Sequence, residues 1–99
     1  MLELIFYEKH KTIERDVIEG IVWKINKTKD FPNGVKYRLV YIHKGIRILG
    51  YDNERAKGDH KHYFDRECLY EFVSPEKLKQ DFLFDIMKIR RGLYGNKEN

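Results

Sequence analysis

The chain has 99 residues, of which 41% are hydrophobic and 36% are charged, and its net charge is +4 at neutral pH. This length fits one domain and is too short for two, so we expect a single domain over residues 1–99. No stretch approaches the roughly 20 apolar residues of a membrane helix, and the one cysteine excludes an internal disulfide. Without a secretion signal in this sequence, we expect a cytoplasmic protein with no membrane partner. The positive charge favours a polyanionic partner such as nucleic acid.

The first quarter of the sequence is expected to form β-structure. Residues 2–7 predict either a short strand or a helical turn, and the alternative for the segment before Asp16 is a helix. Residues 16–25 are rich in β-branched side chains, which favour a strand. The side chains that would share one face of this strand are Val17, Ile21, Trp23 and Ile25.

A turn and a β-hairpin follow. Residues 31–34 are expected to turn, because Pro32 fixes φ and the Asn and Gly after it tolerate tight positions. Residues 35–42 alternate between apolar and polar side chains and predict a half-buried strand, whose partner is expected at residues 46–51 across a loop at 43–45. The apolar face of the first strand consists of Val35, Tyr37, Leu39 and Tyr41.

The C-terminal part contains the clearest element, a helix that begins near Ser74. Ser74 is a good N-cap, and Pro75 suits the first helical position. Gly92 and Gly95 mark the end of the helix, and we expect a flexible tail over residues 95–99. An apolar stripe at helical spacing consists of Leu78, Phe82, Ile86, Ile89 and Leu93, widened by Leu83.

Two further short strands are predicted between the hairpin and the helix, at residues 59–64 and 69–73. The fold class is therefore expected to be α+β: an antiparallel sheet of four to five strands with the C-terminal amphipathic helix packed on one face. A core of this size leaves little room for a deep pocket, so any site should be a shallow groove.

Residues 51–62 carry most of the chemistry, because they contain almost no apolar side chain where a fold needs only a short turn. His60 and His62 are spaced i, i+2, so on a strand they share one face with Cα atoms roughly 6.5–7 Å apart and can act as an acid/base pair. Arg55 and Lys57 precede them and can hold a phosphate. The candidate catalytic residues are His60, His62 and Asp59. The candidate substrate-binding residues are Arg55, Lys57, Tyr51, Asp52, Asn53 and Gly58.

Other side chains of the segment have more general uses. Asp59 could orient a ring nitrogen or accept a proton, although a regular strand would point it to the face opposite His60. Gly58 permits a tight turn or the close approach of a ligand. Tyr51 and Tyr63 could stack on bases.

Three interpretations of this segment stay open on the residues alone. The first is a solvated loop with a surface pair of histidines. The second is a metal site with His-x-His and one carboxylate as ligands, although the sequence does not identify the third ligand. The third, which the density of ionisable side chains favours, is chemistry on a phosphate without a metal or other cofactor.

The excess positive charge lies outside this segment, whose own charges balance. It forms either a solvated rim or a track for a nucleic-acid backbone. The cations concerned are Lys24, Lys27, Lys29 and Lys36 around the turn at Pro32, and Lys88, Arg90 and Arg91 late in the helix.

Residues 35–41, 70–72 and the string YDNERAKGDHKH at 51–62 resemble the TumE-type toxin family of bacterial and archaeal toxin–antitoxin pairs, formerly a domain of unknown function. The long string is specific, and the resemblance covers most of the chain, from about residue 17 to residue 89. Ala56 stands where a glycine is expected, and Cys68 precedes Leu69 where the family tends towards proline-tyrosine. The residues that carry the resemblance most clearly are Lys57, Gly58, Asp59, His60 and His62.

The resemblance implies a bacteriostatic toxin that a cognate antitoxin neutralises, but it does not settle the reaction. From the residue types we infer a metal-independent ribonuclease, in which His60 and His62 serve as general base and acid for attack of a 2′-hydroxyl on the adjacent phosphate. Arg55 and Lys57 would stabilise charge on the phosphoryl oxygens. The expected partners are therefore the antitoxin and RNA. The alternative is a non-catalytic module of the same system that binds protein or nucleic acid.

Overall fold

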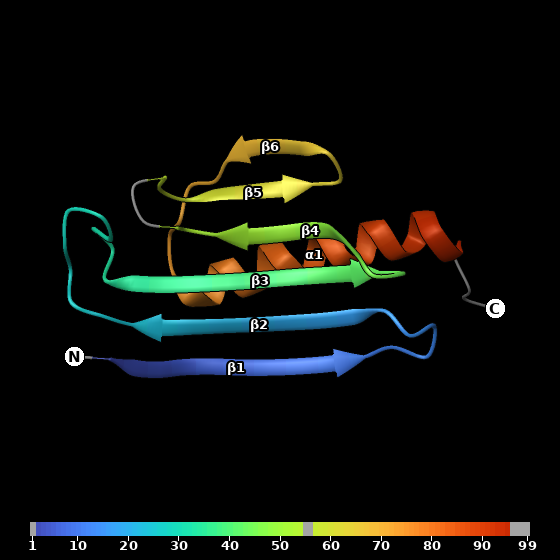
Figure 1. Cartoon of the computed structure of the whole chain (residues 1–99), viewed down its shortest axis with the longest axis horizontal. Helices are drawn as coiled ribbons and strands as arrows, with labels where there is room; N and C mark the ends of the chain where they lie inside the picture. The colour runs from blue at the N-terminus through green and yellow to red at the C-terminus, as the bar shows by residue number, and fades with distance from the viewer. Residues whose placement is uncertain (1, 55–56, 96–99) are drawn as a thin grey trace.

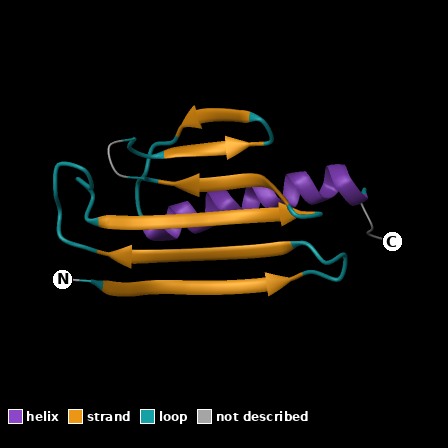
Figure 2. Cartoon of the chain, in the orientation of Figure 1, coloured by secondary structure: helices purple, strands orange, loops and turns teal. Residues whose placement is uncertain are grey.

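Within the described residues, 2–54 and 57–95, six strands form one antiparallel sheet in sequence order, and one helix crosses one face of it (Figure 1). In this computed structural model, each described turn connects strands that are neighbours in the sheet. The sheet is therefore an antiparallel meander (Figure 2). The elements are β1 (Glu3–Lys11), β2 (Val17–Lys24), β3 (Val35–His43), β4 (Ile46–Asp52), β5 (His60–Tyr63), β6 (Arg66–Leu69) and α1 (Pro75–Tyr94).

The α+β class is confirmed, but the sheet has six strands where four to five were expected. At the N-terminus, β1 extends to Lys11 and pairs with β2 from end to end, so this segment is neither a helical turn nor a helix. At the other edge the last strand is β6, and the prediction of a strand at 69–73 was wrong. The turn between β5 and β6 contains only two residues, with Phe64 at a φ of 59°, and so the partner strand already begins at Arg66.

The helix begins after Ser74 and ends before Gly95, as these two residues predict, whereas Gly92, which was also expected to mark its end, lies inside it. The hydroxyl of Ser74 accepts a hydrogen bond of 3.0 Å from the backbone N–H of Lys77, and Gly95 follows the last helical residue. Four residues of the predicted stripe are buried, whereas Leu83 and Leu93 are 48% and 36% exposed. The buried four are Leu78, Phe82, Ile86 and Ile89. No helix in the described part of the chain is long and apolar enough to cross a membrane.

The core lies between α1 and the predicted apolar face of β3, on which Leu39 and Tyr41 are 1% and 0% exposed. On β2 the buried side chain is Val22, so the face that carries Val17, Ile21 and Trp23 turns away from the helix. Gly20 lies on the same helix-facing side as Val22, and a Cβ atom there would lie only 3.2 Å from Cγ of Leu39, so this position leaves little room for a side chain.

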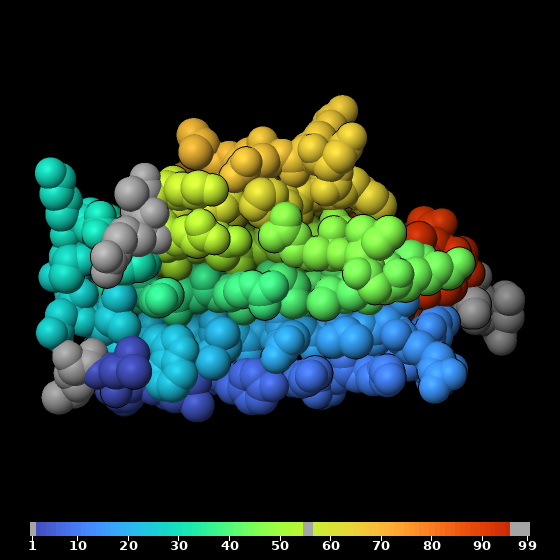
Figure 3. All heavy atoms as spheres, viewed as in Figure 1, coloured from blue at the N-terminus to red at the C-terminus, as the bar shows by residue number. Residues whose placement is uncertain are grey.

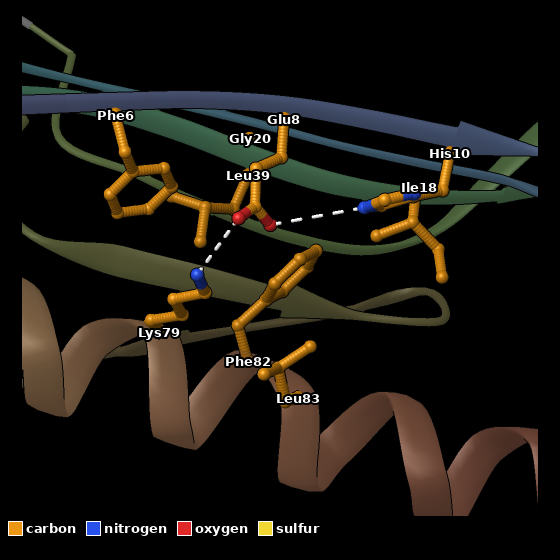
Figure 4. A pocket seen from close by; sticks show the side chains of 9 residues that line it. All are labelled: Phe6, Glu8, His10, Ile18, Gly20, Leu39, Lys79, Phe82 and Leu83. Atoms are coloured by element: carbon orange, nitrogen blue, oxygen red, sulfur yellow. Dashed lines mark hydrogen bonds and ion pairs between the residues drawn. The ribbon is translucent and has the colours of Figure 1, made fainter. Parts of the chain in front are cut away.

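An apolar hollow opens between β1 and α1, beside the place where Gly20 lacks a side chain (Figure 4). An ion pair bridges its rim, with Nζ of Lys79 2.9 Å from Oε2 of Glu8. The apolar side chains around the hollow are Phe6, Ile18, Leu39, Phe82 and Leu83.

A buried carboxylate ties the end of α1 to the sheet. Asp16, 1% exposed, accepts hydrogen bonds of 2.6 Å from the hydroxyls of Tyr41 and Tyr94, and its Oδ1 lies 2.8 Å from Nδ1 of His43. Nη1 of Arg90 lies 3.5 Å from Oδ2. Burial raises the pKa of a carboxyl, but the hydrogen bonds from Tyr41, Tyr94 and His43 outweigh it and hold the pKa of Asp16 below its ordinary value.

Replacement of Asp16 with Asn should lower the free energy of unfolding by roughly 1–3 kcal/mol at neutral pH, because buried donors lose a charged acceptor. A carboxylate with a depressed folded-state pKa stabilises fully above its unfolded-state pKa of about 3.9 and loses that contribution as the pH falls through the folded-state value. The difference between wild type and D16N in urea unfolding should therefore shrink below about pH 4. A difference that stays constant from pH 7 to pH 3 would contradict this role.

Candidate functional site

Two histidines lie side by side on β5, on the face of the sheet opposite α1. Lys61 between them points to the helix, where its Nζ lies 2.9 Å from Oδ2 of Asp85. Because side chains alternate along a strand, His60 and His62 must share the other face. Their rings meet edge to face, with centroids 5.1 Å apart. The pair expected from the i, i+2 spacing is therefore present as a contact between two imidazoles.

His60 is held on both sides of its ring. Its Nδ1 lies 3.1 Å from the carbonyl oxygen of Gly58, and its Nε2 lies 2.9 Å from Oδ1 of Asp52, its neighbour in the sheet. A neutral imidazole has one N–H and can donate only one of these hydrogen bonds. The surroundings of His60, which is 5% exposed, thus offer an acceptor oxygen to each of its two ring nitrogens.

A second carboxylate lies between the two rings. Oε2 of Glu67 is 3.5 Å from Nε2 of His60 and 3.7 Å from Nε2 of His62. Glu67 belongs to the edge strand β6, and its side chain is 53% exposed, whereas that of His62 is 21% exposed. The pair of imidazoles therefore already faces an anionic oxygen, and this oxygen belongs to an exposed side chain.

The same groups could hold a metal ion. One ligand atom from each of Asp52, His60 and His62 lies within 4.8 Å of the others. Imidazole and carboxylate are ligands that Zn²⁺ accepts, and the carbonyl of Gly58 on Nδ1 of His60 is the kind of contact that orients a metal-binding ring. Asp52 is thus the third ligand that the sequence left unidentified for this interpretation.

The structure brings five of the predicted residues together. Lys57 lines a shallow depression with His60 and Glu67, and its own side chain is 64% exposed. Gly58 has a φ of 74°, a conformation that glycine adopts without strain, and this turn aims its carbonyl at His60. Arg55 lies outside the described residues. The five that share this region are Asp52, Lys57, Gly58, His60 and His62.

Three predicted residues lie away from this surface. Tyr51 is 1% exposed, faces the helix and donates a hydrogen bond to Asp85. Asp59 also points to the helix side, where it accepts a hydrogen bond of 2.7 Å from Tyr37, and burial together with this bond raises the pKa of Tyr37. Asn53 is buried and bonds to the backbone of β3 through both halves of its amide. The alternation of side chains explains the positions of Tyr51 and Asp59. Each is adjacent in sequence to a residue of the open face, which is the face of the sheet opposite α1.

Sequence reasoning missed Glu67, because it placed this residue before the last strand rather than in it. The signal was available in the hairpin geometry: with a two-residue turn after Tyr63, Glu67 is the register partner of His62. The same reasoning treated Asp52 as a substrate contact, and the register of β4 against β5 places it opposite His60.

We predict that Asn53 is structural. Its Oδ1 accepts from the backbone N–H of Tyr37 at 3.0 Å, and its Nδ2 donates to the carbonyl of Val35 at 2.8 Å. Asn53→Ala should lower the free energy of unfolding by roughly 1–3 kcal/mol, because two buried backbone groups lose their partners. Lys57→Ala, at an exposed position in the next turn, should change it by less than about 0.5 kcal/mol. Equal unfolding midpoints for the two variants in urea would refute the assignment.

A family model described as Toxin TumE matches residues 5–90, a range that includes both histidines, Asp52 and Glu67. No curated protein and no solved structure matches the chain. The comparison agrees with the resemblance seen in the sequence, and it extends nearly to the end of α1.

Proposed function

The chain belongs to the TumE toxin family. We propose that it is the toxin of a toxin–antitoxin pair, as the family implies, and from the residues of the site that it inhibits growth by cleaving RNA. One observation supports the reaction: two imidazoles on the face of the sheet opposite α1, with ring centroids 5.1 Å apart and the carboxylates of Asp52 and Glu67 close to their Nε2 atoms. Cleavage of RNA by its own 2′-hydroxyl needs a base and an acid close together, and neighbouring histidines are well suited to both tasks.

The proposed reaction needs two proton transfers, one from the substrate to His62 and one from His60 to the leaving group. His62 accepts the proton of the 2′-hydroxyl, the 2′-oxygen forms a bond to phosphorus, and the bond from phosphorus to the 5′-oxygen breaks. His60 donates a proton to the departing 5′-oxygen. The products are a 2′,3′-cyclic phosphate and a new 5′-hydroxyl end. Lys57, at the rim of the depression, stabilises the charge that grows on the phosphoryl oxygens, and the guanidinium of Arg55 is assigned the same role from its chemistry.

The surroundings of the two rings support this division of roles. Both nitrogens of His60 face acceptor oxygens, so its protonated form, the acid, is the one that its neighbours satisfy. His62 has the more exposed side chain, 21% against 6%, and lies better for first contact with a substrate hydroxyl. Glu67 occupies the position between the rings that a phosphoryl oxygen would take, so it has to move aside when RNA binds.

His60→Ala and His62→Ala should each lower RNA cleavage roughly 10²–10⁴-fold, the usual contribution of one positioned proton-transfer group. The assay is cleavage of a mixed-sequence RNA by purified protein in EDTA. His10→Ala is the matched control, because His10 is a 66% exposed histidine on β1, at the far edge of the sheet. Its activity should equal that of wild type.

The other outcomes are informative. Cleavage that disappears in EDTA and returns with a divalent ion would replace the acid/base mechanism with a metal ion at Asp52, His60 and His62. Cleavage by the double His→Ala variant at the wild-type rate would show that neither His60 nor His62 takes part in the reaction. If the wild-type protein does not cleave RNA and loss of both imidazoles abolishes antitoxin binding, the protein is the binding module instead.

Glu67→Gln should raise cleavage at low RNA concentration, because it removes a carboxylate that competes with the substrate phosphate for the two imidazoles. The change should fall on KM rather than on kcat. Glu71→Gln, an exposed position with the same change in charge, is the control and should leave KM close to the wild-type value. A fall in kcat for Glu67→Gln alone would show instead that Glu67 takes part in the reaction.

A further inference from the structure

Two arginines that the sequence analysis did not select lie on the same face as the histidines. Arg38 follows Tyr37 and precedes Leu39, which are both buried against the helix, so its side chain points to the open face, and its register partner is Asp52. Arg47 lies on β4, and its side chain extends over Gly50. A Cβ atom on Gly50 would lie 3.2 Å from Cδ and 3.5 Å from Nε and Nη1 of Arg47.

Gly50 therefore decides where the guanidinium of Arg47 lies. In the register of the sheet, Gly50 is the neighbour of His62 on β5. The absence of a side chain at this one position leaves room for the cation of Arg47, from the start of β4, to lie over Gly50, one strand away from the imidazole pair.

Shallow depressions connect this region across the sheet. One depression contains Arg38, Arg47 and Asp52, and Asp52 contacts His60. A second shares Lys36, Tyr37 and Arg38 with the first and continues to Trp23 on β2. Figure 3 shows this face of the molecule, with β2 to β5 side by side. The two depressions and the contact of Asp52 with His60 together span four adjacent strands, from Trp23 on β2 to His60 on β5.

The charges on this path suit a polyanion. Within the described residues no carboxylate forms an ion pair with Arg38 or Arg47. The nearby acids are already engaged, since Asp52 contacts His60 and Glu54 contacts Lys57. A guanidinium binds phosphate through two parallel hydrogen bonds. A half-exposed indole offers the flat surface on which an unpaired base can stack.

We propose that this face is the binding track for single-stranded RNA: Arg38 and Arg47 bind consecutive backbone phosphates, and Trp23 stacks on a base. The track delivers the phosphate next in line to His60 and His62. This inference rests on the proposed function for its choice of RNA, but binding to the track requires no cleavage and can be measured by itself.

The test measures binding of a fluorescent 2′-O-methyl oligonucleotide, which cannot be cleaved because its 2′-oxygen carries no proton. Arg38→Gln and Arg47→Gln should each weaken binding roughly fivefold at 0.1 M salt and reduce the slope of log affinity against log salt by about 0.7, the value for one phosphate on a single strand. Arg91→Gln is the control, because Arg91 is an exposed cation of the last turn of α1 with the same change in charge.

Two more variants test the position of the Arg47 guanidinium and the stacking of Trp23 without changing the net charge. Gly50→Ala keeps every charge but displaces the guanidinium of Arg47, so it should weaken binding severalfold. Trp23→Leu should weaken binding roughly tenfold with an unchanged salt slope, because stacking releases no counterions.

The results distinguish this track from the catalytic proposal. If Arg38→Gln and Arg47→Gln bind the oligonucleotide like Arg91→Gln, or if wild type does not bind it, the track is refuted. A second result would also refute the RNA track: the oligonucleotide does not bind, but an acidic peptide binds and its binding requires both arginines. That result would assign the face to a protein partner. If the arginine variants lose binding while the double His→Ala variant cleaves RNA normally, the track stands and the acid/base pair falls.

Discussion

The ion pair between Lys61 and Asp85 determines which side of the sheet carries the chemistry. Asp85 is 4% exposed and also accepts a hydrogen bond from Tyr51, so a buried charge on the helix is tied to the sheet by one lysine of β5 and one tyrosine of β4, besides its ion pair with Lys88 on the helix itself. A buried carboxylate without its partners is strongly destabilising. Lys61 is therefore fixed towards the helix, and the alternation of the strand leaves the open face to both of its histidine neighbours.

Local rules of side-chain pattern and capping were enough to predict much of the fold. Val35, Tyr37, Leu39 and Tyr41 were expected on one face, and they form the centre of the core. Ser74 and Gly95 bound the helix as their conformational preferences require. The last strand was misplaced because the tight turn before it has Phe64 at a positive φ. This conformation is rare for a large side chain, so the residue type at position 64 does not predict the turn.

The site was harder to predict than the fold, because it depends on register. The spacing of His60 and His62 suffices to place them on one face, but their partners come from other strands. Asp52 and Glu67 meet them only through the pairing of β5 with β4 and β6. The alternation of side chains also directs Asp59 and Tyr51 to the helix side of the sheet, although both belong to the same polar segment. Chemical composition located the segment, and the hydrogen-bond ladder decided which half of it faces outwards.

The strand that carries Glu67 is the least protected part of the sheet. β6 has four residues, all of them exposed, and it is attached to β5 alone, whereas β1 to β4 have seven to nine residues each. Local opening of a protein begins where little surface is buried. Fraying of this edge would uncover the imidazoles while the helix, the core and the cluster at Asp16 stay intact. Rearrangement at the histidines would then need only local opening of β6 and no global unfolding.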